Sequence, residues 1–154
     1  MVFREIVFGS DEYRLECELR NTVLREPLGL SLTVEELARE EDQLHFGLFE
    51  PDGRLVACVV AVGLSPTDAR IRQMAVSPTH RRRGLGTRLL SELEANLRAR
   101  GFENFVLNAR ATAVGFYQKL GFTVIGDEFL DVRVAHFRMM KRSRNRPMPP
   151  DGAA

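Results

Sequence analysis

Hydrophobic and polar residues change their spacing several times along the chain, and each change marks the boundary of a predicted element. Residues 55–64 are almost continuously apolar, as in a strand buried on both faces. Residues 70–76 alternate basic and apolar side chains, which is typical of a half-buried strand. A stripe at helical spacing consists of Leu85, Leu89, Leu93 and Leu97. This stripe predicts a helix over residues 87–100, which Gly101 would end.

The same patterns give further elements before and after this central region. Strands are predicted at residues 2–8, 45–49, 105–107, 122–125 and 132–140, and helices at residues 11–24, 33–41 and 112–120. Ser10 and Thr33 stand where N-cap side chains accept backbone N–H groups. The order β-α-α-β-β-β-α-β-α-β-β predicts a mixed sheet with helices on both faces, in the α/β or α+β class.

The length of 154 residues suits one domain, which we expect over residues 1–141. Residues 142–154 offer almost nothing to bury, so we expect a disordered tail. The longest apolar run has eight residues, whereas a membrane helix needs roughly 20, and no secretory signal is evident. Cys17 and Cys58 are too few for a disulfide scaffold or a four-ligand zinc site. We therefore expect a cytoplasmic protein without a metal.

The net charge of +1 conceals an uneven distribution of charged residues. Residues 1–50 carry 12 acidic and 5 basic side chains, whereas residues 51–154 carry 9 acidic and 17 basic ones. The acidic side chains gather at Glu35, Glu36, Glu40, Glu41 and Asp42. An acidic rim beside a basic region would suit a cationic acceptor and an anionic cofactor, but solvated helix faces would give the same pattern.

The segment from Gln73 to Thr87 is the most informative part of the chain. A strand ends at Val76, a loop with three consecutive arginines and two glycines follows, and then a long helix begins. A helix N-terminus exposes backbone N–H groups and the positive end of the helix dipole, and glycine lets an anion approach closely. The pattern therefore predicts a pyrophosphate-binding site. It matches neither a Walker A loop, which needs Gly-Lys-Ser/Thr, nor a dinucleotide fingerprint, whose third glycine is replaced by Leu89.

Two motifs here resemble signatures of the Gcn5-related N-acetyltransferase (GNAT) family. Val-x-Pro-x-x-Arg-x-x-Gly-x-Gly, from Val76 to Gly86, is similar to the acyl-CoA-binding motif of that family. The second motif, Tyr-x-x-x-Gly-Phe, runs from Tyr117 to Phe122. The stretch from Gly126 to Met139 resembles the end of the ElaA-like subgroup. The resemblance covers residues 10–141 and implies a mostly antiparallel sheet of six to seven strands flanked by about four helices.

The resemblance also implies an activity and a cofactor site. The activity is direct transfer of an acetyl group from acetyl-CoA to a primary amine of a small molecule or peptide, in a ternary complex. Backbone groups of residues 74–76 would pair with the pantetheine arm, and Arg110 takes the place of a family asparagine, for which Asn108 would substitute. The implied cofactor-binding residues are Met74, Ala75, Val76, Arg81, Arg82, Arg83, Gly84, Leu85, Gly86, Thr87, Asn108 and Tyr117. We expect a monomer or homodimer without nucleic-acid or membrane partners.

Tyr117 and His136 are the catalytic residues that the resemblance implies. Tyr117 stands at the position of the acid that protonates the leaving thiolate, and the ordinary pKa of a tyrosine is about 10. Many family members place a glutamate base where this chain has Gln73, which cannot accept a proton. His136 stands where the ElaA-like subgroup has a histidine and is one candidate base. The other candidates are His45, Glu40 and Glu41.

Two other functions remain open at this point. Gln73 in place of the glutamate would also suit an acyl-CoA-binding regulatory relative that has lost catalysis. The arginine loop and the basic residues between Lys141 and Arg146 could instead bind nucleic acid. Against this second reading, the net charge is low and no aromatic residue stands beside the arginines for base stacking.

Overall fold

The computed structural model describes residues 1–142, which form a seven-stranded sheet in the order β1-β2-β3-β4-β5-β7-β6. The strands are β1 (Val2–Ile6), β2 (Leu44–Phe49), β3 (Leu55–Gly63), β4 (Asp68–Val76), β5 (Asn104–Arg110), β6 (Thr123–Asp131) and β7 (Val134–Arg142). Neighbouring strands are antiparallel except for β4 and β5, which are parallel. The expected mixed and mostly antiparallel sheet is therefore confirmed.

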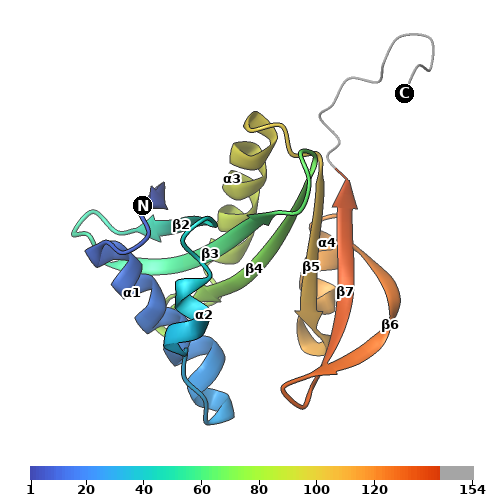
Figure 1. The fold of residues 1–154 in the computed structure, drawn as a ribbon, viewed down its shortest axis with the longest axis horizontal. Helices are drawn as coiled ribbons and strands as arrows, with labels where there is room; N and C mark the ends of the chain where they lie inside the picture. Colours follow the sequence, from blue (N-terminus) through green and yellow to red (C-terminus); the bar gives the residue numbers. More distant parts are fainter. Residues whose placement is uncertain (143–154) are drawn as a thin grey trace.

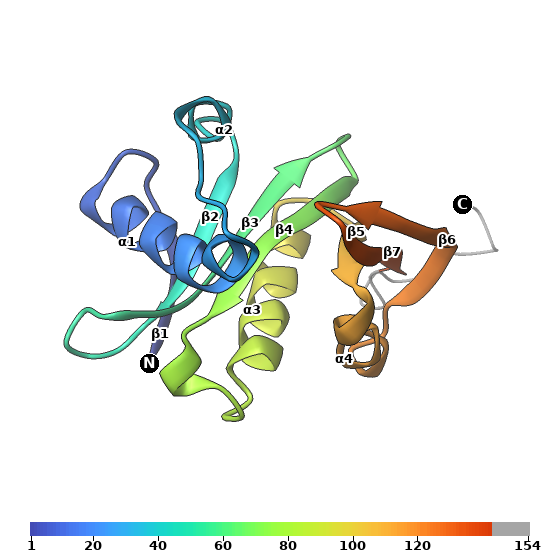
Figure 2. The same cartoon turned by 90° about the horizontal axis from the view of Figure 1, so that it is seen from below.

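Four α-helices cover the sheet, two on each face (Figures 1 and 2). They are α1 (Asp11–Arg20), α2 (Val34–Ala38), α3 (Leu85–Ala99) and α4 (Val114–Lys119). Seen from below, α1 and α2 lie over one face of the strands β2, β3 and β4, and α3 lies on their opposite face (Figure 2). On the same side of the sheet as α3, α4 packs against β5 and β6. Within residues 1–142, no helix covers the face of β5 and β7 opposite α4 (Figure 2). In residues 1–142, no helix is long and apolar enough to span a membrane.

The leucine stripe of α3 forms the centre of the main core, as predicted. All four leucines are buried and pack with side chains of β2, β4 and β5, such as Phe46, Ile71 and Phe105. Complete burial of one such side chain contributes about 1.5–3 kcal/mol to the free energy of folding, relative to leaving it exposed to water. Gly101 follows α3 with φ +100°, a conformation that few other residues adopt without strain. α3, which begins directly after the predicted pyrophosphate-binding loop, is therefore packed against the core along its length.

The first helix differs from its prediction in length and in its buried face. Ser10 caps it, since its Oγ accepts the Tyr13 N–H at 3.2 Å, but the α-helix ends at Arg20 rather than at residue 24. A π-helical turn, Asn21–Arg25, and a 3-10 turn, Glu26–Leu28, continue the chain as far as Gly29. The residues that α1 buries are Tyr13, Glu16 and Arg20, and two of these are charged. Hydrophobic spacing could not identify this buried face.

The last two strands are longer than predicted. They were expected at residues 122–125 and 132–140, whereas Val132 and Arg133 form the two-residue turn between β6 and β7. Both turn residues have positive φ, 49° and 62°, as a tight hairpin turn requires. Neither residue is a usual turn former, so no residue pattern predicts this turn. Arg142 is the last residue of β7, and the remainder of the expected tail, 143–154, lies outside the described residues.

The sheet opens between β4 and β5 (Figure 1). The two strands pair only where residues 68–70 of β4 face residues 104–106 of β5, and beyond this point they separate. On its other edge, β4 has a bulge opposite β3, where Gln73 adopts φ +54°. Bulges of this kind bend a strand and are frequent beside active sites. The opening and the bulge together define the place of the candidate site.

Candidate active site

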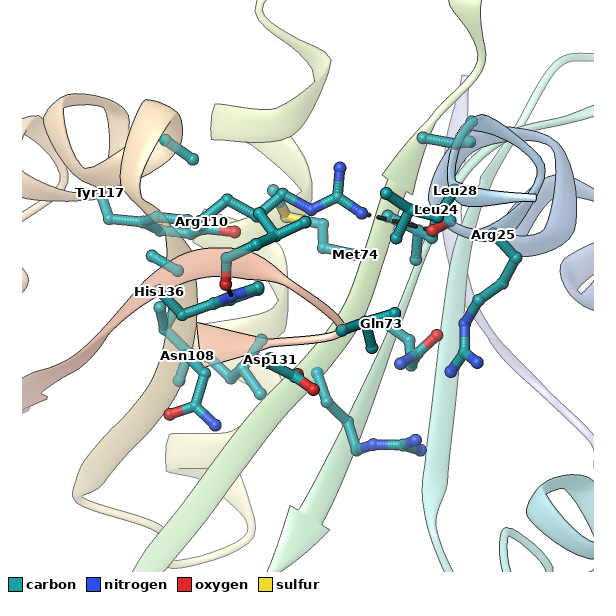
Figure 3. A pocket seen from close by; sticks show the side chains of 18 of the residues that line it. Leu24, Arg25, Leu28, Gln73, Met74, Asn108, Arg110, Tyr117, Asp131 and His136 are labelled. Atoms are coloured by element: carbon teal, nitrogen blue, oxygen red, sulfur yellow. Dashed lines mark hydrogen bonds between the residues drawn. The ribbon is translucent and has the colours of Figure 1, made fainter. Parts of the chain in front are cut away.

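A cavity of about 540 Å³ lies where β4 and β5 separate. The segment that follows α1 closes one side of it, and α4 and the β6–β7 hairpin close the other (Figure 3). The lining residues are Val23, Leu24, Arg25, Leu28, Leu30, Arg70, Ile71, Arg72, Gln73, Met74, Arg81, Leu107, Asn108, Ala109, Arg110, Ala113, Phe116, Tyr117, Asp131, Val132, Val134 and His136. Most are apolar or basic, and Asp131 is the only acidic residue among them.

The structure brings some of the predicted site residues to this cavity and leaves others beside it. The predicted residues in the lining are Met74, Arg81, Asn108, Tyr117 and His136. Those outside the lining are Ala75, Val76, Arg82, Arg83, Gly84, Leu85, Gly86 and Thr87. They form the end of β4, the loop and the first turn of α3, so they continue from the cavity beyond Arg81.

The loop before α3 has the backbone geometry of an anion-binding turn. Arg82 and Gly84 have positive φ, 65° and 72°, and left-handed residues of this kind let successive N–H groups converge on an anion. A Cβ added to Gly84 would meet nothing within 4 Å, so the space above it is open. A Cβ added to Gly86 would lie 3.2 Å from Phe116 Cζ, so this position is closely packed. An exposed loop with three arginines at the start of a 15-residue helix fits a phosphate group.

Tyr117 lies on α4 and reaches the cavity from the side of the core. Its ring packs edge-on against Phe116, at 5.1 Å between centroids, and against Phe122, at 5.8 Å. Burial raises the pKa of Tyr117 to about 12, because the phenolate would be poorly solvated there. The hydroxyl therefore keeps its proton at neutral pH and can donate a hydrogen bond into the cavity.

His136 lies on β7 directly opposite Arg110 of β5, on the same side of the cavity as Tyr117 (Figure 3). Its Nδ1 lies 2.7 Å from the backbone oxygen of Val134. Since a carbonyl oxygen only accepts, Nδ1 carries the proton of the neutral imidazole, and in this tautomer Nε2 has the lone pair. Nε2 has no hydrogen-bond partner among residues 1–142. The ring stacks on Phe129, which holds its orientation.

Several lining residues were not predicted because only the tertiary fold brings them here. Leu24, Leu28 and Arg25 come from the irregular turns after α1, and Asp131 comes from the β6–β7 hairpin. Arg110 donates a hydrogen bond to the backbone oxygen of Leu24 at 3.3 Å, across the cavity mouth (Figure 3). No motif marks these positions, and the pairing of Arg110 with a carbonyl group 86 residues away has no local signal.

The alternative base candidates do not line this cavity. His45 is buried, and both of its ring nitrogens are engaged, Nδ1 with Glu16 at 3.0 Å and Nε2 with the Glu40 backbone oxygen at 3.0 Å. Glu40 is also buried, and its carboxylate accepts hydrogen bonds from Arg20, Arg72 and Tyr13. Burial alone would raise the pKa of Glu40, but the two arginines lower it to about 2. Neither group is free to take a proton from a substrate.

The acidic region from residue 35 to residue 42 does not form the rim that would attract a cationic acceptor. Glu35, Glu41 and Asp42 are exposed and lie outside the cavity lining, and Glu36 pairs with Arg25 at 3.2 Å. Donor atoms of Glu16, Glu40 and His45 lie within 4.8 Å of one another, as in a metal site. Arg20 and Arg72 already supply the positive charge there, so a cation would have to displace them.

A profile of the family described as "Acetyltransferase (GNAT) domain" matches residues 29–143. The chain belongs to the GNAT family of acetyltransferases. Two proteins of Bacillus subtilis are similar to it. The uncharacterized protein YyaT is 33% identical over 78 residues, and the uncharacterized N-acetyltransferase YjcF is 37% identical over 73 residues. These matches cover 50% and 47% of this chain and 53% and 52% of the relatives, so the chain spans about half the length of the curated relatives it matches.

Solved structures show the same GNAT fold. A putative N-acetyltransferase from Lactobacillus plantarum has a TM-score of 0.79 at 22% identity and covers 92% of this chain and 99% of its own. An aminoglycoside 6'-N-acetyltransferase complexed with coenzyme A has a TM-score of 0.79 at 17% identity over 96% and 99% of the two chains. Escherichia coli ElaA has a TM-score of 0.77 at 19% identity over 92% and 100%.

Proposed function

We propose that this GNAT protein transfers an acetyl group from acetyl-CoA to a primary amine of a small molecule or peptide, directly and within a ternary complex. The observation that carries the proposal is the cavity between β4 and β5, which leads to the arginine and glycine loop before α3. The likeness to a coenzyme A complex of the same fold supports it. The proposed compartment is the cytoplasm, where Cys17 and Cys58, both free thiols, would stay reduced.

The chain offers separate groups for the two ends of the donor. Backbone groups of residues 74–76 face the opening, where β5 has already separated from β4, so a pantetheine arm could pair with them as a strand would. Arg81, Arg82 and Arg83 would hold the phosphates together with the N–H groups of residues 84–87. Acetyl-CoA would supply the acetyl group and the thiolate leaving group.

Two side chains of the cavity offer the proton acceptor and the hydrogen-bond donor that the transfer needs. An amine must lose a proton as its C–N bond forms, and the lone pair on Nε2 of His136 can accept that proton. The C–S bond breaks as the acetyl group moves, and the protonated hydroxyl of Tyr117 can donate to the sulfur. Because a thiol is a stronger acid than a tyrosine with a pKa of about 12, Tyr117 stabilises the thiolate through a hydrogen bond rather than by complete proton transfer.

Thermal unfolding with increasing acetyl-CoA tests the donor site first. At 100 times its Kd, a ligand stabilises the folded state by about 2.7 kcal/mol, so the midpoint should rise in a saturable way. Release of free thiol with a panel of amines then measures turnover. A shift without turnover would favour the regulatory relative that only binds acyl-CoA, and no shift at millimolar acetyl-CoA would contradict the proposal.

Gly84→Asp and Gly84→Asn form a matched pair for the same site. Both side chains tolerate the left-handed conformation and enter open space, so they differ mainly in charge. We expect Gly84→Asp to lose the acetyl-CoA-dependent shift, because a carboxylate would face the phosphates, and Gly84→Asn to keep most of it. Equal shifts in the two variants would place the phosphates elsewhere.

A further inference from the structure

Arg70 lies at the end of the cavity that is farthest along β4 from the arginine loop. It is the last β4 residue that pairs with β5, opposite Val106, so it stands where the two strands begin to separate. Six residues of extended chain separate it from Val76, which corresponds to roughly 20 Å. A donor that runs from the loop along residues 76–74 would leave Arg70 on the acceptor side. Arg70 also lines a second, smaller cavity of about 250 Å³ beside α2.

The other arginines of the larger cavity with a described partner already use their donors within the protein. Arg72 donates to Glu40 and Gln43, both at 2.9 Å, Arg25 pairs with Glu36, and Arg110 donates to a backbone oxygen. Arg70, in contrast, forms no ion pair or side-chain hydrogen bond with another residue in the range 1–142, and the carboxylate of Asp131 attracts it without direct contact. It is half-buried, so its charge is only partly solvated.

The charged groups that face Arg70 do not neutralise it. Arg72 on its own strand and Arg138 on β7 repel it, and Asp131 at the β6–β7 turn is the acidic group that attracts it. Burial lowers the pKa of Arg70 below the ordinary arginine value, and the two like charges lower it further. A guanidinium still keeps its charge, and a bound anion would relieve both the repulsion and the incomplete solvation.

The acids of the smaller cavity do not serve as this anion. Glu36 and Glu40 line it, but Glu40 is shared between Arg20 and Arg72, and Oε1 of Glu36 pairs with Arg25, whereas Oε2 of Glu36 is buried without a hydrogen-bond partner among residues 1–142. Arg39 adds a further basic residue to the lining. Three arginines, Arg39, Arg70 and Arg72, outnumber the two acids in this lining, so the acceptor end carries a net positive charge, which disfavours a polycationic amine.

We infer that Arg70 binds an anionic group of the acceptor, a carboxylate or a phosphate, and that the acceptor is an amine that also carries such a group. The inference rests on the proposed acetyl transfer and names its substrate class. The guanidinium fork can bind either anion through two parallel hydrogen bonds. The acceptor would then lie with its anion toward Arg70 and its amine toward His136, which lines the same cavity.

Matched acceptor pairs test this inference in the wild-type protein. One pair is an amino acid and its primary amide, and the other is an amino sugar phosphate and the same sugar without phosphate. A charge-assisted hydrogen bond predicts a kcat/KM about 10- to 100-fold higher for the anionic member of at least one pair, mostly through KM. The pair with the larger ratio identifies the anion. Equal or better use of the neutral members in both pairs would overturn the inference while leaving acetyl transfer intact.

Three variants test whether the preference for an anionic acceptor depends on Arg70. They are Arg70→Gln, Arg70→Glu and a control at an exposed arginine. We expect Arg70→Gln to abolish the preference for the anionic acceptor and Arg70→Glu to reverse it, whereas Arg14→Gln, an exposed change of the same charge on α1, should keep the wild-type ratio. The acetyl-CoA-dependent unfolding midpoint of each variant shows whether it is folded. A preference that survives in a folded Arg70→Gln would overturn the assignment.

A binding measurement decides the inference even if no amine is turned over. Titration calorimetry of the N-acetylated anionic and neutral compounds, with coenzyme A present, should show tighter binding of the anionic compound to wild type and equal binding to Arg70→Gln. Absence of turnover would count against acetyl transfer, and equal binding to wild type would count against the role of Arg70.

Discussion

Two polar clusters meet on β4, and they treat their charges in opposite ways. On the side of α1 lie Glu16, Arg20, Glu40 and His45, all buried and bonded to one another. On the side of β5 lie the polar groups of the cavity, where Arg70 forms no ion pair among the described residues, although Asp131 attracts it, and Nε2 of His136 is free to accept. Arg72, bound to Glu40, connects the first cluster with the cavity wall.

The difference shows which polar residues serve the fold and which are left for a ligand. A buried charge costs several kcal/mol unless it is paired, so the loss of one member of the first cluster, which we call the saturated cluster, should strongly destabilise the fold. The second cluster, which includes Arg70 and His136, lies at a cavity where water or a ligand can form hydrogen bonds with its polar groups. The fold therefore does not require these groups to have partners within the protein. Substitutions should therefore affect stability in the first cluster and turnover in the second.

The largest expected effect is on stability, from Glu40→Gln. This change removes the charge that Arg20 and Arg72 share, and breaking a buried pair costs about 3–5 kcal/mol. Urea unfolding measures it. The control is Glu41→Gln, an exposed neighbour, for which we expect a change within about 0.5 kcal/mol. If the two variants unfold at the same urea concentration, the saturated cluster does not stabilise the fold.

The same residue predicts an acid limit to stability. The pKa of Glu40 is lowered from 4.5 to about 2 in the folded protein, so the folded state binds fewer protons than the unfolded state between these values. Its contribution of about 3 kcal/mol is present above pH 4.5 and is lost as the pH falls toward 2. Urea midpoints measured over this range should fall more steeply for wild type than for Glu40→Gln. Parallel curves would show that Glu40 is not the titrating group.

The smallest effect in free energy, but the most specific to the cavity, is expected for Tyr117→Phe. The hydroxyl is lost while the ring that packs on Phe116 and Phe122 is kept. We expect kcat to fall about 100-fold, which corresponds to about 2.7 kcal/mol, with little change in acetyl-CoA affinity or in the unfolding midpoint. Steady-state kinetics measures the split. An unchanged kcat would remove Tyr117 from the reaction.

The sequence predicted the fold well where hydrophobic period and caps agreed. The leucine stripe of α3 and the Ser10 and Thr33 caps were all confirmed. Prediction failed where polar residues are buried, as in α1. It failed again at the β6–β7 turn, where Val132 adopts a conformation that its side chain disfavours.

The candidate site divides in the same way. The residues of one continuous motif, from Met74 to Thr87, could be named because a strand, a glycine loop and a helix follow one another locally. Other residues that line the cavity could not be named from the sequence. Arg25, Arg70 and Asp131 come from three separate segments, which only the tertiary fold brings together. The charge pattern of the acidic residues before β2 also did not distinguish Glu40, which is buried, from its exposed neighbours Glu41 and Asp42.

The short contact between β4 and β5 also makes the sheet two arms joined by a narrow seam. Three residue pairs form the seam, and the hydrogen bond from Arg110 to Leu24 is a second tie at the far side of the opening. A ligand that lies between β4 and β5 would contact both strands, as an additional strand would. It would therefore restrict the motion of one arm of the sheet relative to the other. Amide hydrogens of β5 should then exchange more slowly with solvent in the liganded protein, although the ligand does not touch most of them.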